Sequence, residues 1–151
     1  MLARRANRRT YKKTALYPSG NPNGSVAFSD DLTEPSELVE VTIEAVQWVA
    51  YIQGVWRDRD GKEREGAVHG HTHGDPAVSF RLEEGEWISQ VDGWYGKYID
   101  YLKFTTNKGN YKEWGTPGGG GNTAFSVEGR INGFYGFAEG SLDGICFFHP
   151  Y

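Results

Sequence analysis

The sequence has almost no sulfur, with one Cys and one Met among 151 residues. A single cysteine, Cys146, excludes an internal disulfide, and its place in an apolar run predicts a core residue. No apolar stretch is long enough to span a bilayer, so we expect no membrane insertion. Helical spacing of apolar residues is not sustained anywhere. A chain of this length can bury a core without disulfides or a structural metal, which predicts one domain.

Acidic residues are missing from the start of the chain, because the first of them is Asp30. Six of the sixteen basic residues precede it, which leaves ten basic against twenty acidic residues afterwards. An acidic body does not attract phosphate, so we expect no nucleic-acid partner. Residues 1–14 are predicted to be a flexible basic arm before a domain at 15–151; an Arg-rich, acid-free start also resembles an organelle transit peptide. The arm has no apolar signal region, so the location stays open, and we expect by default a cytoplasmic chain or one that is secreted by a non-standard route.

Glycine and aromatic residues are abundant instead, with 21 Gly, 5 Trp, 9 Tyr and 8 Phe. This composition favours short strands joined by glycine turns. Three glycine-bearing segments, at 20–25, 70–74 and 118–122, each lead toward a short aromatic strand that ends at Phe28, Phe80 or Phe125. A strand pair follows each segment, and these pairs align at positions 50, 100 and 143. Such recurrence predicts three similar sheets around a shared core, because one small sheet cannot bury its apolar face alone.

The residues from about 17 to 151 resemble the jacalin-related lectin family. The matching segments are Ala27-Phe28-Ser29-Asp30-Asp31, the hairpin at 56–63, Gly85-Glu86-Trp87-Ile88-Ser89, 91–96, 102–107 and 131–136. The resemblance implies an all-β fold, the β-prism I, with three four-stranded Greek-key sheets in pseudo-threefold symmetry. It also implies a carbohydrate-binding protein with no enzymatic activity, no cofactor and no metal.

In that family a sugar lies between a glycine loop with backbone N–H donors and a Gly-x-x-x-Asp loop with an accepting carboxylate. Glycine suits the donor loop because a missing Cβ lets the backbone approach a ligand closely. Fixed donors beside a fixed acceptor recognise the geometry of sugar hydroxyls. Carried over, the first expected site consists of Gly24, Ser25, Gly140, Ser141, Leu142 and Asp143. Glu139 stands where the family has glycine, which leaves the shape of this loop open and adds a negative charge beside the sugar. Ser25 also replaces a usual glycine, although its N–H stays available.

The second expected site follows the family pattern fully and consists of Gly96, Lys97, Tyr98, Asp100, Gly121 and Asn122. Its tyrosine is placed as in griffithsin, a member that binds mannose in all three repeats. The third repeat reads Val46-Gln47-Trp48-Val49-Ala50 and lacks both the glycine and the carboxylate. We expect no sugar there.

Other interpretations of these residues remain open. Asp100 and Asp143 are also the residue type that caps turns by hydrogen bonding to nearby backbone N–H groups. The alternating His69, His71 and His73 would share one face of a strand, which is a weak indication of a metal site. An exposed loop equivalent to the family's His-Gly-Gly-x-Gly-Gly segment explains them as well.

The expected function is binding of mannose- or glucose-type glycans and glycoproteins. In the family, galactose preference accompanies a cleaved chain with a free glycine amine in the first loop, whereas here residues 1–24 continue from that loop. Single shallow sites bind weakly, so a homo-oligomer is also expected. The alternative is a prism that has lost sugar binding and serves as a protein-interaction module.

Overall fold

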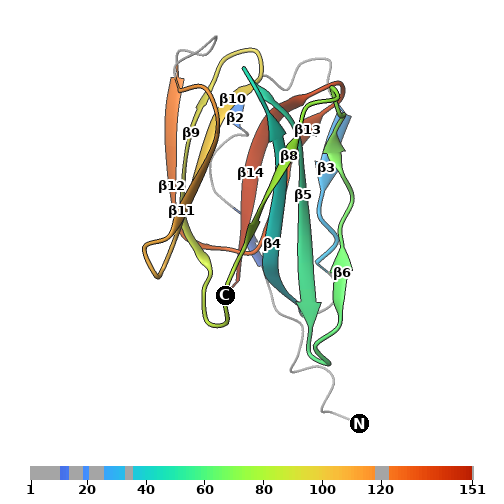
Figure 1. Ribbon diagram of the computed structural model, residues 1–151, viewed down its shortest axis with the longest axis vertical. Helices are drawn as coiled ribbons and strands as arrows, with labels where there is room; N and C mark the ends of the chain where they lie inside the picture. Colours follow the sequence, from blue (N-terminus) through green and yellow to red (C-terminus); the bar gives the residue numbers. More distant parts are fainter. Residues whose placement is uncertain (1–10, 14–18, 21–25, 33–35, 118–122, 151) are drawn as a thin grey trace.

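The computed structural model describes residues 11–13, 19–20, 26–32, 36–117 and 123–150. Within these residues the chain forms fourteen strands and no helix, so none that could cross a membrane. The strands build three antiparallel sheets. Figure 1 shows one sheet at the left (β9 to β12) and another at the right (β4 to β8), with β14 of the third between them in this view. The all-β prediction is confirmed.

The sheet of residues 88–131 has the simplest topology. Its strands are β9 (Ile88–Tyr95), β10 (Ile99–Thr106), β11 (Tyr111–Gly115) and β12 (Thr123–Ile131). Their spatial order is β11-β10-β9-β12, so the fourth strand returns to lie beside the first. This is the Greek-key order that the family resemblance implied.

The second sheet repeats this order with a divided outer strand. Its strands are β4 (Ser36–Ala45), β5 (Val49–Asp58), β6 (Glu63–Glu65), β7 (His69–Gly70) and β8 (Ala77–Arg81). The order is β6-β5-β4-β8, and β7 also pairs with β5. The two short strands β6 and β7 together occupy the position that β11 fills in the first sheet.

The third sheet joins the two ends of the chain. Its strands are β1 (Tyr11–Lys13), β2 (Ser19–Gly20), β3 (Val26–Ser29), β13 (Gly133–Ala138) and β14 (Leu142–Pro150). The order is β1-β14-β13-β3, and β2 also pairs with β14. Tyr11 pairs with Pro150 and Lys13 with Phe148, so a strand lies inside the segment 1–14 that we expected to be a separate arm.

The strand register relates the three sheets to one another. Tyr51 pairs with Gly70, Tyr101 with Gly115, and Gly144 with Gly20. Tyr51, Tyr101 and Gly144 are therefore equivalent in the three repeats. The residues that precede them, at positions 50, 100 and 143, are equivalent as well. The structure confirms the alignment predicted from the sequence.

Side chains from all three sheets meet in one core. Trp56, Phe104, Phe134 and Phe147 are among the largest fully buried residues. The rings of Phe104 and Phe134 stack with centroids 6.1 Å apart, which joins the first sheet to the third. Burying a side chain of this size stabilises the fold by about 2 kcal/mol. Cys146 is buried, as its sequence context predicted.

Buried polar groups link the sheets through specific bonds. Asp30 bonds to His69 Nε2 through Oδ1 at 2.6 Å and accepts the Phe134 N–H through Oδ2 at 2.7 Å. Asn132 accepts the Leu38 N–H at 2.9 Å and donates to the Ser36 carbonyl at 3.0 Å. His69 belongs to the second sheet and Phe134 to the third, so Asp30 links these two sheets, and Asn132, between β12 and β13, links its own segment to β4 of the second sheet. These bonds therefore fix how the sheets pack.

Candidate functional site

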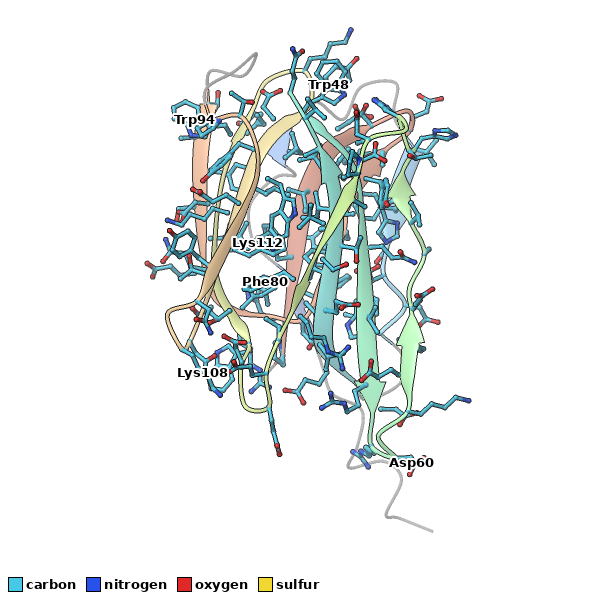
Figure 2. The ribbon with its side chains drawn as sticks, in the orientation of Figure 1. Trp48, Asp60, Phe80, Trp94, Lys108 and Lys112 are labelled. Carbon is cyan, nitrogen blue, oxygen red and sulfur yellow. The ribbon has the colours of Figure 1, made fainter. Side chains whose placement is uncertain are left out.

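Three loops meet at one end of the prism. They connect β4 to β5, β9 to β10, and β13 to β14, and they contain the positions that the sequence compared across the repeats. Figure 2 shows Trp48, from the loop between β4 and β5, at this end, while Asp60 and Lys108 lie at the opposite end. The candidate site is therefore built by connections between paired strands, whose rigid ladders hold them in place.

The loop at 96–100 ends in a buried carboxyl group. The Gly96 N–H donates to the Tyr98 carbonyl at 3.0 Å, which closes the turn. Asp100, at the start of β10, is 5% exposed. Its Oδ2 accepts no hydrogen bond within the part of the chain that the structure describes. Burial raises the pKa of Asp100 above its ordinary value, because the charged form loses solvation.

The loop at 139–143 has the same turn. The Glu139 N–H donates to the Ser141 carbonyl at 3.1 Å, which matches the bond between Gly96 and Tyr98. No non-glycine residue described in the structure has a positive φ, so Glu139 fits this turn without backbone strain. Ser141 and Asp143 are 6% and 8% exposed. Glu139 therefore forms the same turn as Gly96 does, which answers the question about loop shape that the sequence left open.

Four residues are predicted to form the backbone donor loops of the two sites. Gly24, Ser25, Gly121 and Asn122 lie outside the described residues. Their roles as backbone donors stay predictions.

Trp48, from the loop 46–50, contacts both the loop 96–100 and the loop 139–143. Its Nε1 donates to Ser141 Oγ at 3.1 Å. Its indole stacks on Tyr98 with ring centroids 5.5 Å apart and an angle of 29°. Lys97 Nζ also lies 5.5 Å from the centroid of the Tyr98 ring. The sequence does not predict that Trp48 contacts the other two loops. The only signal for this contact is its position in the loop 46–50, which aligns with them.

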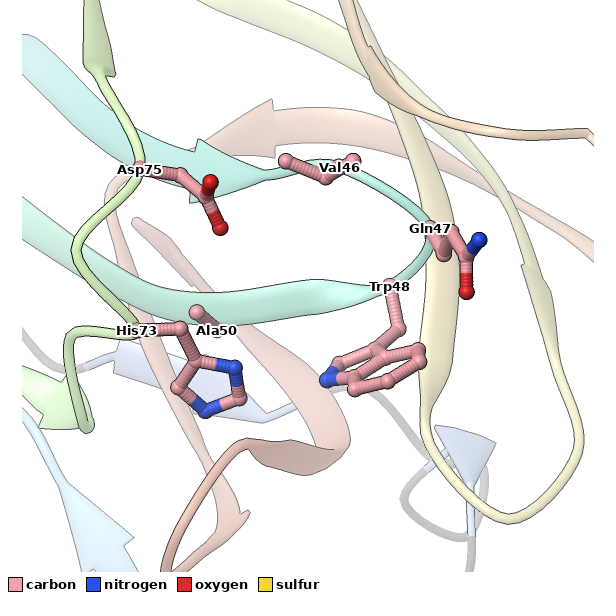
Figure 3. A pocket seen from close by; sticks show the side chains of 6 residues that line it. All are labelled: Val46, Gln47, Trp48, Ala50, His73 and Asp75. Atoms are coloured by element: carbon pink, nitrogen blue, oxygen red, sulfur yellow. The ribbon is translucent and has the colours of Figure 1, made fainter.

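The third repeat forms a pocket of its own, although it lacks the glycine and the carboxylate of the other two loops. The pocket has a volume of about 230 Å³ and is lined by Val46, Gln47, Trp48, Ala50, His73 and Asp75. Figure 3 shows the loop of 46–48 on one side, His73 and Asp75 on the facing segment, and Ala50 between them. The sequence does not predict this pocket, because no local pattern places the loop 46–50 against residues 73–75.

The facing segment is held by a buried acid on β4. Glu44 accepts a hydrogen bond from Thr72 Oγ1 at 2.6 Å and another from the His73 N–H at 2.7 Å. Burial alone would raise the pKa of Glu44, but these hydrogen bonds lower it overall below its ordinary value. The ionised carboxylate therefore fixes the position of residues 72–75.

The three alternating histidines point to different partners. His69 contacts Asp30, His71 Nδ1 contacts the Thr72 carbonyl at 2.8 Å, and His73 Nε2 contacts the Gly140 carbonyl at 2.7 Å. Among the described residues no group of three or more His, Cys, Asp or Glu side chains is arranged to hold a metal ion. The shared strand face required for a metal site does not form.

Comparison with curated proteins finds two plant relatives. The chain is 31% identical to Jacalin-related lectin 44 of Arabidopsis thaliana over 93 residues, which are 58% of this chain and 16% of the relative. It is 27% identical to Myrosinase-binding protein 1 of the same plant over 99 residues, which are 61% of this chain and 21% of the relative. The match thus spans about a fifth of these relatives or less.

Solved structures with the same fold are also found. A mannose-specific jacalin-related lectin from Morus nigra in complex with mannose aligns with a TM-score of 0.78 at 23% identity, covering 94% of this chain and 96% of that one. A mannose-binding jacalin-related lectin from Ananas comosus aligns with a TM-score of 0.76 at 24% identity, covering 93% and 99%. At these identities the likeness establishes the β-prism fold.

The amino-acid sequence also matches the model of a protein family. The Jacalin-like lectin domain model matches residues 16–148, which include all three loops at the candidate end of the prism. The chain belongs to the Jacalin-like lectin domain family.

Proposed function

We propose that the chain is a lectin that binds mannose- or glucose-type residues of glycans at the loops ending in Asp100 and Asp143. The observation that carries this proposal is the carboxyl group of Asp100, which is buried beside a short turn and keeps Oδ2 unpaired within the described residues. An unpaired buried oxygen costs about 1 to 3 kcal/mol, so a fold retains it where a ligand supplies the donor. Adjacent sugar hydroxyls are such donors.

Asp143 extends the proposal to a second loop. It occupies the position equivalent to Asp100, follows the same backbone turn and is similarly buried. The donors facing each carboxylate are proposed to be the backbone N–H groups near Gly24 and Ser25 in one site and near Gly121 and Asn122 in the other. Gly140 contributes an exposed position where a Cβ would meet nothing within 4 Å, which leaves room for a ligand.

The preference for mannose or glucose rests on the family resemblance and on the fold. Two of its solved structural neighbours are described as mannose-binding lectins. A hydrolase would instead need two carboxyl groups placed on either side of one glycosidic bond. The loop 96–100 contains a single carboxyl group, that of Asp100.

The test is calorimetric titration of methyl α-mannoside and methyl α-glucoside into the full chain and into Asp100→Asn, Asp143→Asn and the double variant. Each single variant should lose one site and the double variant all binding, while Asp60→Asn, at the opposite end of the prism, should bind as the parent does. No binding by the parent, or full binding by the double variant, rejects the proposal. The first result would favour a prism that acts as a protein-interaction module.

We further propose that the lectin is a homo-oligomer. A single shallow sugar site is weak, and linking several sites raises avidity by about 10² to 10⁴. Light scattering of the purified chain should give a mass above that of the 151-residue protomer. A monomer at all accessible concentrations would contradict this part of the proposal.

A further inference from the structure

The pocket of the third repeat differs in chemistry from the two loops proposed to bind sugar. At the position where the other repeats have Asp100 and Asp143, it has Ala50, whose side chain lies between the two walls (Figure 3). Val46 and the indole of Trp48 add further apolar surface. A sugar ring in this place would turn hydroxyls toward methyl groups and leave them unpaired, which costs about 1 to 3 kcal/mol for each group. The floor of the pocket therefore favours a hydrocarbon.

Hydrogen-bond acceptors outnumber donors at the walls. Trp48 Nε1 is already used by Ser141, so it is no donor for a ligand. His73 Nε2 lies 2.7 Å from the Gly140 carbonyl. Because a carbonyl only accepts, Nε2 carries a proton, and in the tautomer that has its proton on Nε2 the other ring nitrogen, Nδ1, is an acceptor. Only Gln47, which is exposed, offers both donors and acceptors.

Asp75 supplies a negative charge at the same pocket. It is exposed, and none of the ion pairs formed among the described residues involves it. The segment that carries it is fixed by the two hydrogen bonds from Thr72 and His73 to Glu44. The charge is thus held in a defined place before any ligand arrives.

The surroundings reinforce this charge. Across the loops 46–50, 71–75, 96–100 and 139–143 there are four carboxyl groups and a single lysine, Lys97. That lysine lies against the ring of Tyr98. A cluster of carboxyl groups at one end of a domain attracts cations to it.

We propose that this pocket binds an alkylammonium group, the chemistry of a lysine side chain or of a free aliphatic amine. The hydrocarbon part packs on Ala50, Val46 and Trp48, and the ammonium group donates to Asp75 and His73. The pocket volume of about 230 Å³ suits one side chain, since pockets for drug-sized ligands have roughly 300 Å³ or more. This pocket adjoins the proposed sugar loops through Trp48 and His73, but it takes a different class of ligand.

The experiment is an NMR titration of the full chain that follows the indole N–H signal of Trp48. The probes are n-butylammonium and Nα-acetyl-lysine N-methylamide, with n-butanol and Nα-acetyl-norleucine N-methylamide as neutral controls of similar shape. Both ammonium probes should shift the signal in a saturable way, and the neutral ones should not. Equal binding of charged and neutral probes would overturn the proposal.

The variants Asp75→Asn and Asp60→Asn separate the pocket charge from the net charge. Both remove one exposed carboxylate, at the pocket and at the opposite end respectively. Asp75→Asn should weaken ammonium binding by about fivefold, the effect of losing one exposed ion pair, and Asp60→Asn should not change it. Equal affinity of the two variants for n-butylammonium would also overturn the proposal.

The two ammonium probes distinguish the sources of the ligand. Tighter binding of the lysine derivative assigns the pocket to a side chain of a partner protein, whereas tighter binding of n-butylammonium assigns it to a free amine. Methyl α-mannoside titrated into Asp75→Asn should bind as it does to the parent. If the parent binds methyl α-mannoside but neither ammonium probe, only the inference about this pocket is rejected. If the parent binds the ammonium probes but not methyl α-mannoside, only the lectin proposal is rejected.

Discussion

Trp48 Nε1 donates a hydrogen bond of 3.1 Å to Ser141 Oγ, so the loop 46–50 supports the loop 139–143. The same indole stacks on Tyr98 of the loop 96–100. One side chain therefore contacts both loops that we propose to bind sugar. The repeat that lacks the Gly-x-x-x-Asp residues contributes to the other two by holding them in place.

Replacing Trp48 by Phe should weaken sugar binding at one loop only. Phenylalanine keeps an aromatic ring against Tyr98 but removes the N–H donor to Ser141, a bond that contributes about 1 kcal/mol. In an Asp100→Asn background, where only the Asp143 loop remains, Trp48→Phe should raise the Kd for methyl α-mannoside by about fivefold. Calorimetry measures this change.

The matched measurement uses the other loop. In an Asp143→Asn background the same substitution should leave the Kd almost unchanged, because stacking on Tyr98 is retained. Trp94→Phe, at the same end of the prism, serves as the control for loss of an indole (Figure 2). An equal effect on both loops would show that Trp48 acts on the whole end of the prism and not through Ser141.

Asp100→Asn should stabilise the protein at neutral pH while it removes sugar binding at the loop 96–100. Burial raises the pKa of Asp100 above its ordinary value of 3.8, so the carboxyl group favours the folded state fully only below about that pH. This contribution is lost as the pH rises through the higher pKa of the folded state. The uncharged amide avoids the loss, which predicts a gain of about 1 kcal/mol, or roughly 3 °C in Tm, at pH 7. Thermal unfolding of both proteins from pH 3.5 to 7 should show the difference growing with pH.

Gly115→Ala should disrupt the Asp100 loop. Gly115 has a φ of +83°, and a Cβ built there would lie 2.0 Å from the Asp100 carbonyl oxygen. Gly109 has a nearly equal φ of +84°, but a Cβ there would meet nothing within 4 Å. We expect a loss of about 1 kcal/mol for Gly109→Ala, from the backbone alone, and of at least about 3 kcal/mol for Gly115→Ala. Urea unfolding compares them, and equal losses would refute the role of the close approach.

Glu44→Gln should loosen the segment 72–75 in a pH-dependent way. Hydrogen bonds from Thr72 and His73 outweigh burial and lower the pKa of Glu44, so its contribution to stability is present above pH 4.5 and is lost as the pH falls through the lower pKa of the folded state. Glutamine keeps one accepting oxygen, which predicts a loss of about 1 to 2 kcal/mol at pH 7 and little difference from the parent at low pH. Urea unfolding at several pH values tests this, with the exposed Glu65→Gln as the control. A loss that does not depend on pH would contradict it.

The sequence was informative about the repeats because glycine turns and alternating apolar residues are local patterns. Equivalence of positions 50, 100 and 143 could be read from it, and the pairing of Tyr51, Tyr101 and Gly144 with glycines confirms that equivalence. The strand at Tyr11–Lys13 was missed, because its partner β14 lies at the other end of the chain and the segment is rich in basic residues. The shape of the turn at Glu139 could not be predicted either, because whether a turn needs glycine depends on φ, which residue identity alone does not give.

The sequence by itself determined the all-β class, the threefold repeat and the two turns that end in Asp100 and Asp143, because strand periodicity and turn chemistry are set by neighbouring residues. Only the tertiary structure decided that Trp48 bonds to Ser141, that Glu44 fixes the segment 72–75, and that Ala50 and Asp75 share a pocket. Those contacts join residues from different loops or different repeats. Their geometry follows from how three sheets pack around one core, and no local pattern encodes it.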